Sequence, residues 1–394
     1  MEGKNQRYAP GLDHVRAFAA SWIVIYHSFQ LISARLVRDD TFDPHKDWIS
    51  SRNPIVALAE EGHTAVGMFM VLSGFVLARA AIGSDINYWR FLQNRVLRIY
   101  PMFLVTILAG LALVQGVQPL DSILMTLLPI GSVEAMARLG PFSNSLWAIP
   151  VEFQFYLVFP FLMGMLRKNG PRQLGLILLA AVVMRGLVFA AGGALSYATY
   201  FTILGRIDEF LIGMLAAYYV AKRPSTSRWP FLIVVVLNVG ILYGYNQVRG
   251  YVSDDGWKML WPTVQGGMWA AFIVTYLPVS QRMWVSASKF LSEVGKVSFS
   301  VYLLHFVLVS TVSSSIRADM IVGWDPQFVA LLIGGFLILP ATVVISRLTY
   351  AAIEEPFLNM RVRYLKEVEK TGPYVPSSEI PAPNQNSVSS TFEL

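Results

Sequence analysis

Two ionisable residues, Arg16 and His27, lie within one apolar segment near the start of the chain. They are eleven positions apart. That is about three turns of an α-helix at ~3.6 residues per turn, so both side chains lie on one helix face. Ionisable groups are costly at bilayer depth and normally face a protein interior or a water-filled cavity. The pair therefore indicates a chain that spans a membrane and handles something polar inside it.

The composition is typical of a polytopic membrane protein. Of the 394 residues, 55% are hydrophobic and 14% are charged, whereas soluble domains average about 45–50% and about 25%. The apolar residues form blocks of roughly twenty, the length that crosses a bilayer core of ~30 Å. We predict an all-α, polytopic helical bundle with about ten transmembrane helices. These are expected at residues 12–32, 62–80, 101–117, 146–166, 174–191, 197–221, 231–245, 260–278, 291–315 and 328–350.

Loop charges predict the orientation of the bundle. Lysine and arginine number 18 in one alternating set of loops and 8 in the other, and the richer set is expected in the cytoplasm. Both termini are then cytoplasmic, and the net charge of +6 requires no nucleic-acid partner. We expect a transmembrane domain at residues 1–356. A cytoplasmic tail at residues 357–394 is expected to be mostly disordered, because its sequence is rich in Pro, Ser and Asn.

His27 is the first candidate for chemistry. Its imidazole has an unperturbed pKa near 6.5, and a neighbouring carboxylate can raise its basicity, so it is suited to act as a general base. The alternative is a histidine that only bonds a neighbouring helix. Glu152 enters from the outer side and lies at about the same depth as His27. This carboxylate either orients His27 or neutralises a buried arginine.

A second set of candidates is basic. Arg16 either clamps an anion or extends to the membrane surface, and Asp13 one turn earlier can pair with it. Arg95 and Arg98 share a helix face and, with Arg16, can hold a polyphosphate, although loop topology alone explains many such clusters. We expect residues 85–98 to form an amphipathic helix along the membrane surface. Pro101 is expected to begin the next span.

Other polar residues also fall within predicted spans, among them Ser73 and His305. Arg206 and Glu209 are three positions apart and can neutralise each other, whereas His63 is expected at the membrane interface. No cysteine is present, which excludes disulfides and thiolate chemistry. No set of His, Asp and Glu has a metal-ligand spacing, so we expect no metal site.

Seven blocks of sequence resemble the membrane-bound acyltransferase 3 family, in the family's order and from about residue 12 to residue 357. The blocks are LDHVRAFAASWIVIYH, FMVLSGFVL, RFLQNRVLRIYP, SLWAIPVEFQFYLVFP, GRIDEFLIGM, VGKVSFSVYLLH and AAIEEPF. The resemblance implies transfer of an acyl group, most often acetyl, from cytoplasmic acyl-coenzyme A to a hydroxyl of an extracytoplasmic or lipid-linked carbohydrate. Acetyl-coenzyme A is then a substrate, no cofactor is bound permanently, and the location is the bacterial cytoplasmic membrane.

The resemblance also implies roles for residues. His27, Arg16 and Glu152 are expected in catalysis. The resemblance places Arg95 and Arg98 near the donor phosphates, and we also expect substrate contacts from Ser73, Arg206, Tyr302 and His305. Two departures from the family pattern, at His14 and Glu355, lie away from the expected chemistry.

Two other functions remain open from the residues alone. A transporter of a polar or anionic solute would use the buried ionisable residues as a relay, but the internal repeats and broken helices common in transporters are not evident. A membrane scaffold would use the same residues only as buried ion pairs.

Overall fold

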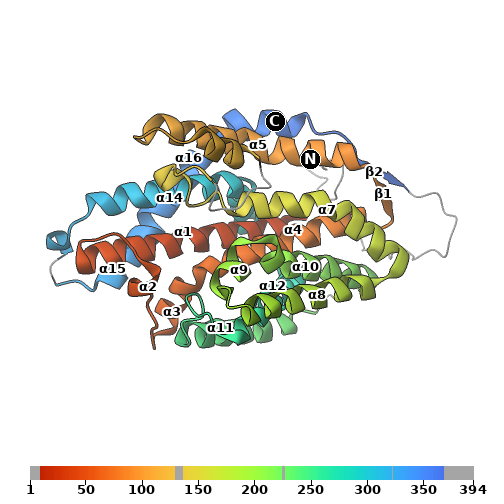
Figure 1. The fold of residues 1–394 in the computed structure, drawn as a ribbon, viewed down its shortest axis with the longest axis horizontal. Helices are drawn as coiled ribbons and strands as arrows, with labels where there is room; N and C mark the ends of the chain where they lie inside the picture. The colour runs from red at the N-terminus through yellow and green to blue at the C-terminus, as the bar shows by residue number, and fades with distance from the viewer. Residues whose placement is uncertain (1–8, 129–135, 224–226, 322, 368–394) are drawn as a thin grey trace, which may run out of the picture.

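Helices make up most of the computed structural model, which describes residues 9–128, 136–223, 227–321 and 323–367 (Figure 1). Within these residues, eight helical segments are long and apolar enough to cross a membrane. They are α1 (Pro10–Arg38), α3 to α4 (Pro54–Ala81), α5 (Tyr88–Leu113), α7 (Ala148–Asn169), α8 (Pro171–Ala190), α11 (Trp229–Gln247), α14 (Ser298–Ser315) and α15 to α17 (Pro326–Asn359). The predicted polytopic helical bundle is confirmed.

Two further long helices, α10 (Ile203–Lys222) and α12 (Trp261–Ser280), occupy the sixth and eighth predicted spans. The count of ten crossings and the side on which the termini lie stay predictions. Short elements connect the bundle: α2 (Pro44–Asp47), α6 (Leu120–Leu127), α9 (Leu195–Phe201) and α13 (Val285–Lys296), with 3-10 turns η1 (Glu61–Thr64), η3 (Gly140–Phe142), η4 (Gly256–Leu260) and η5 (Ala318–Ile321). The last long segment is divided into α15 (Pro326–Ile333), η6 (Gly334–Ile338), α16 (Leu339–Thr349), η7 (Tyr350–Glu354) and α17 (Glu355–Asn359), of which η6 and η7 are π-helical.

The two ends of the bundle differ. One end carries the antiparallel strand pair β1 (Ser84–Ile86) and β2 (Leu365–Glu367), and we call it the basic end (Figure 1). The other carries α2 and the last turn of α1, and we call it the loop end (Figure 1). Helix α1 runs through the interior between them, where it packs against α4, α12, α13, α14 and α15. Its small and apolar residues allow this central position, and Arg16 and His27 are both half-buried on it.

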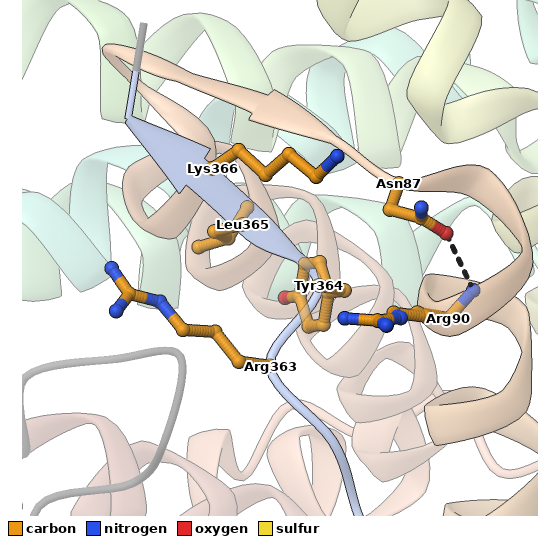
Figure 2. A pocket seen from close by; sticks show the side chains of 6 residues that line it. All are labelled: Asn87, Arg90, Arg363, Tyr364, Leu365 and Lys366. Carbon is orange, nitrogen blue, oxygen red and sulfur yellow. Dashed lines mark hydrogen bonds between the residues drawn. The ribbon is translucent and has the colours of Figure 1, made fainter.

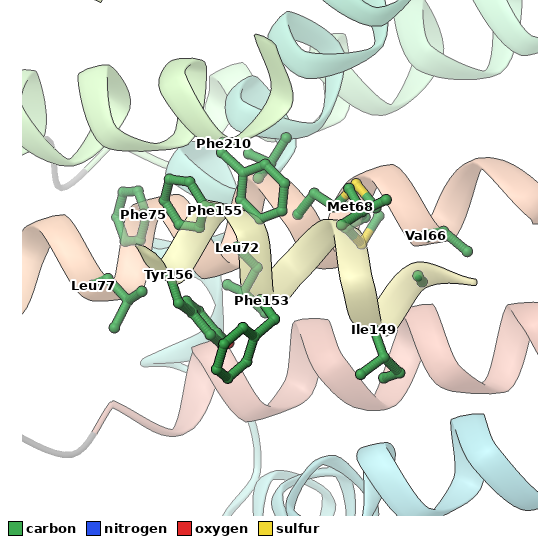
Figure 3. Packing of buried hydrophobic residues seen from close by; sticks show 14 of the residues in the cluster. Val66, Met68, Leu72, Phe75, Leu77, Ile149, Phe153, Phe155, Tyr156 and Phe210 are labelled. Carbon is green, nitrogen blue, oxygen red and sulfur yellow. The ribbon is translucent and has the colours of Figure 1, made fainter. Parts of the chain in front are cut away.

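Helices α4 and α10 approach unusually closely because glycines face the partner backbone. A Cβ added to Gly74 would lie 2.1 Å from the carbonyl oxygen of Phe210, and one added to Gly213 would lie 2.1 Å from that of Val71. Small residues at such crossings are characteristic of membrane helices. Aromatic residues of α7 fill the neighbouring space, with the rings of Phe155 and Phe210 stacked at 4.1 Å (Figure 3). This packing places Ser73 of α4 against α7.

The separate surface helix predicted for residues 85–98 is not formed. The chain enters β1, and the side chain of Asn87 then caps α5 by accepting a hydrogen bond from the Arg90 N–H at 3.1 Å. Pro101 lies inside this single helix instead of beginning a new one. A proline can be tolerated within a membrane helix because surrounding groups compensate for the lost hydrogen bond.

The beginning of the predicted tail folds back on α5. Asn94 donates to the Val362 carbonyl at 2.7 Å and accepts from the Val362 N–H at 2.9 Å. Tyr364, just before β2, is buried. The remainder of the predicted tail, residues 368–394, lies outside the described residues.

Candidate active site

A cavity of about 950 Å³ extends from the loop end into the bundle and reaches His27. Its wall includes one face of α1, where Tyr26, His27 and Gln30 lie. Polar residues Arg35 and Asp40 line the part nearest the loop end. A polar molecule can therefore reach His27 from the loop end.

His27 lies beside a second imidazole. The ring centroids of His27 and His305 are 5.2 Å apart, and Phe306 packs edge-on against His27 at 5.0 Å. The Nδ1 of His305 lies 2.7 Å from the Tyr302 carbonyl oxygen. Because a carbonyl only accepts, we assign the His305 proton to Nδ1 and the lone pair to Nε2.

Each of the two imidazoles has one ring nitrogen that makes no hydrogen bond to a described residue. Within the described part of the chain, His27 Nδ1 and His305 Nε2 are buried and have no hydrogen-bond partner. Such nitrogens are uncommon in folded proteins unless a ligand, a water or a reaction uses them. His27, His305 and Tyr302 thus lie together, as the sequence-based site requires, and Tyr302 also lines the cavity.

Glu152 has other partners. Its Oε1 accepts hydrogen bonds from Tyr156 and, at 3.1 Å, from Ser73. Among the described residues, Glu152 makes no hydrogen bond to His27. The expected orienting contact is therefore absent there, and Glu152 instead bonds Ser73 and Tyr156. The guanidinium of Arg95 lies over the Tyr156 ring at 5.5 Å, and its Nε is buried without a described partner. Arg95, Tyr156, Glu152 and Ser73 therefore form one polar group joining α5, α7 and α4.

The other basic candidates lie toward the basic end. Arg16 forms the predicted ion pair with Asp13. Arg98 pairs with Glu354 at 3.2 Å, and this carboxylate also accepts from Ser300. The sequence-based site missed Glu354, although it lies in the AAIEEPF block. A carboxylate within an apolar run could have drawn attention to Glu354. Its partner Arg98 is 256 positions away, however, so local spacing could not predict the ion pair.

Positive charge accumulates beyond the membrane-spanning helices. Burial, and then the nearby guanidiniums of Arg98 and Arg95, lower the pKa of Arg361 to about 10. A pocket of about 410 Å³ lies close to β1 and β2 (Figure 2). Its lining consists of Asn87, Arg90, Arg363, Tyr364, Leu365 and Lys366. This end of the bundle is suited to an anion because like charges gather there.

His63, predicted at the membrane interface, is 2% exposed and lines the cavity. The turn η1 leads into α4 and places His63 among aromatic side chains. Arg206 forms the anticipated ion pair with Glu209 at 2.8 Å. Its guanidinium also lies 4.3 Å from the centroid of the Tyr200 ring, and Tyr200 lines the cavity. Arg206 thus lies behind an aromatic wall of the cavity.

Comparison with known proteins gives concordant results. A family model described as an acyltransferase domain matches residues 10–350. Acyltransferase MdmB of Streptomyces mycarofaciens is 26% identical over 329 residues, which are 76% of this chain and 81% of that protein. O-acetyltransferase OatA of Staphylococcus aureus is 24% identical over 386 residues, which are 89% of this chain but only 57% of OatA. No solved structure gives a significant match.

Proposed function

Because the chain belongs to the acyltransferase domain family, we propose that it transfers an acetyl group from acetyl-coenzyme A to a carbohydrate hydroxyl. It is a multi-pass membrane acyltransferase, and we place it in the bacterial cytoplasmic membrane with the basic end in the cytoplasm. One observation carries the proposal. A cavity from the loop end reaches the half-buried imidazole of His27, whose buried Nδ1 has no partner within the described chain.

The proposed reaction begins with the acceptor in the cavity. The imidazole of His27 takes the hydroxyl proton as the acceptor oxygen bonds to the thioester carbonyl carbon. The carbon–sulfur bond then breaks, and the coenzyme A thiolate leaves with the proton from the imidazolium. The second imidazole, His305, lies close enough to share that proton in the buried site. No metal is required by this sequence of steps.

The donor is proposed to bind through its phosphates at the basic end. Guanidinium groups recognise phosphate oxygens through paired, charge-assisted hydrogen bonds. Arg95 and Arg98 lie on the first turns of α5, with Arg361 nearby. Arg16 lies on the same helix as His27, so α1 connects the donor region to the base. Glu152 is proposed to position Ser73 and Tyr156 between these regions.

The proposed reaction is tested with purified protein in lipid nanodiscs. We expect acetyl-coenzyme A and a carbohydrate acceptor to give free thiol together with an acetylated sugar, detected by mass spectrometry. Surface glycans of cells that lack the protein should lose the mass increment of acetyl groups. Absence of both thiol release and glycan change would contradict the proposal and favour the transporter hypothesis.

Arg95→Met is expected to raise KM for acetyl-coenzyme A about tenfold, because one charge-assisted hydrogen bond contributes about 1.5–3 kcal/mol. The KM for the acceptor should change much less. Arg172→Met is the matched control, since Arg172 is exposed and is predicted to face the same side. Steady-state kinetics with each substrate varied in turn measures both constants. An unchanged donor KM for Arg95→Met would remove Arg95 from the donor site.

A further inference from the structure

Glu61 and His63 form a buried carboxylate–imidazole pair that the proposed reaction does not use. His63 Nε2 lies 2.9 Å from Glu61 Oε2, and the two side chains are 2% and 0% exposed. The other carboxylate oxygen of Glu61 accepts from Asn246 Nδ2 at 3.1 Å. We assign the shared proton to Nε2 of His63, because an ionised carboxylate only accepts; a carboxylate orients imidazoles in other enzymes in a comparable way.

The opposite nitrogen of His63 is left as an acceptor. Nδ1 is buried and has no hydrogen-bond partner in the described ranges, although His63 lines the cavity. A buried acceptor without a partner costs free energy. A ligand hydroxyl in the cavity would satisfy it.

Aromatic rings surround this imidazole. The centroids of Tyr251, Trp48 and Tyr200 lie 4.8, 5.6 and 5.6 Å from that of His63. Tyr251 and Tyr200 also line the cavity. Behind Tyr200, Arg206 Nη2 is a buried donor without a partner among the residues described. Aromatic ring faces combined with a few directed polar groups are characteristic of a binding site for a small organic molecule.

The pair lies next to the reacting imidazole. The ring of Tyr26 is 4.6 Å from that of His27 and 5.7 Å from that of His63, measured between centroids. The two histidines therefore flank one side chain within the same cavity. A single sugar residue can contact both of them.

We propose that His63, held by Glu61, forms a sugar-binding subsite in which Nδ1 accepts a hydrogen bond from a hydroxyl that is not acylated. This contact determines which hydroxyl of the ring lies at His27. The inference rests on the proposed function. His63 is here a binding and positioning residue, and the proton of the reacting hydroxyl still goes to His27.

The experiment uses the full chain in nanodiscs, acetyl-coenzyme A, and a panel of methyl hexosides with their single-deoxy analogues. For His63→Ala we expect the KM for the best hexoside to rise at least tenfold, with a much smaller change in the KM for acetyl-coenzyme A. His63→Gln, which retains an acceptor atom, should recover part of the affinity. Glu61→Gln, which keeps the shape but loses the charge, should give an intermediate effect. His45→Ala is the matched control, because His45 is exposed at the same end.

The deoxy series separates binding from a merely structural effect. The wild-type protein should discriminate strongly against one deoxy analogue, and His63→Ala should accept that analogue and its parent almost equally. If His63→Ala does not fold, the same comparison is made with His63→Phe, which keeps a ring but has no acceptor atom. Equal discrimination in wild type and variant would overturn the subsite. Failure of the proposed function itself would look different, because the wild-type protein would then acetylate no hexoside and release no thiol.

Discussion

His27→Ala is expected to lower kcat for acyl transfer by about 10²–10⁴-fold, the usual contribution of a positioned general base. Folding should change little, because Nδ1 of His27 has no hydrogen-bond partner within the described chain. Removal of the imidazole therefore leaves no neighbouring donor at Nδ1 without its acceptor. Thiol release and acetylated product, measured with both substrates saturating, check the rate. Thermal unfolding in detergent checks the fold.

His14→Ala provides a control on the same helix. The His14 ring bonds the Tyr276 hydroxyl at 3.1 Å and Ser288 at 3.0 Å, so it ties α1 to α12 and α13. Its replacement should lower thermal stability and leave turnover per folded molecule close to that of wild type. A His27→Ala protein that turned over as fast as wild type would exclude His27 as the base. The pair of imidazoles, His27 and His305, would then have only a packing role.

Local spacing predicted the contacts that form within one helix. Arg16 with Asp13, and Arg206 with Glu209, are both three positions apart on helical segments, and both ion pairs are present. Such pairs follow from helical geometry alone. The helical class followed similarly from the length of the apolar blocks.

Contacts between distant segments could not be predicted in this way. The partner of Arg98 is Glu354, and β1 pairs with β2 through Ser84 and Glu367. The position of Glu152 along its predicted span indicated its depth in the membrane. It did not indicate the direction in which the side chain points. Its hydrogen bond to Ser73 depends on how α4 and α7 pack. Pattern and spacing therefore indicated which residues to consider, and tertiary packing decided how they are grouped.

The position of His63 illustrates the same limit of local patterns. Its neighbours in sequence gave no indication that Trp48, Tyr200 and Tyr251 would surround it. These rings come from three separate connections at the loop end. An imidazole near the start of a span was consequently assigned to the interface, whereas folding buries it against the cavity.

Arg185→Met is expected to cause the largest loss of stability, about 3–5 kcal/mol, because it leaves a buried carboxylate uncompensated. Arg185 and Asp208 are each 0% exposed and form two hydrogen bonds, of 3.0 and 2.8 Å. Arg185 also donates to the carbonyls of Met259 at 2.8 Å and Leu204 at 3.1 Å. It thus joins α8 to α10 and to η4. Thermal unfolding in detergent and the amount of protein in the membrane measure the loss.

A double variant identifies the cause. Arg185→Met combined with Asp208→Leu removes both charges, and apolar replacement of a buried pair is often neutral or stabilising. It should therefore recover much of the lost stability. Arg317→Met is the matched control, because Arg317 and Asp319 form an exposed pair, and exposed pairs contribute little. If the double variant remained as unstable as Arg185→Met, the essential contribution would be the hydrogen bonds from Arg185 to Met259 and Leu204, and charge compensation would be secondary.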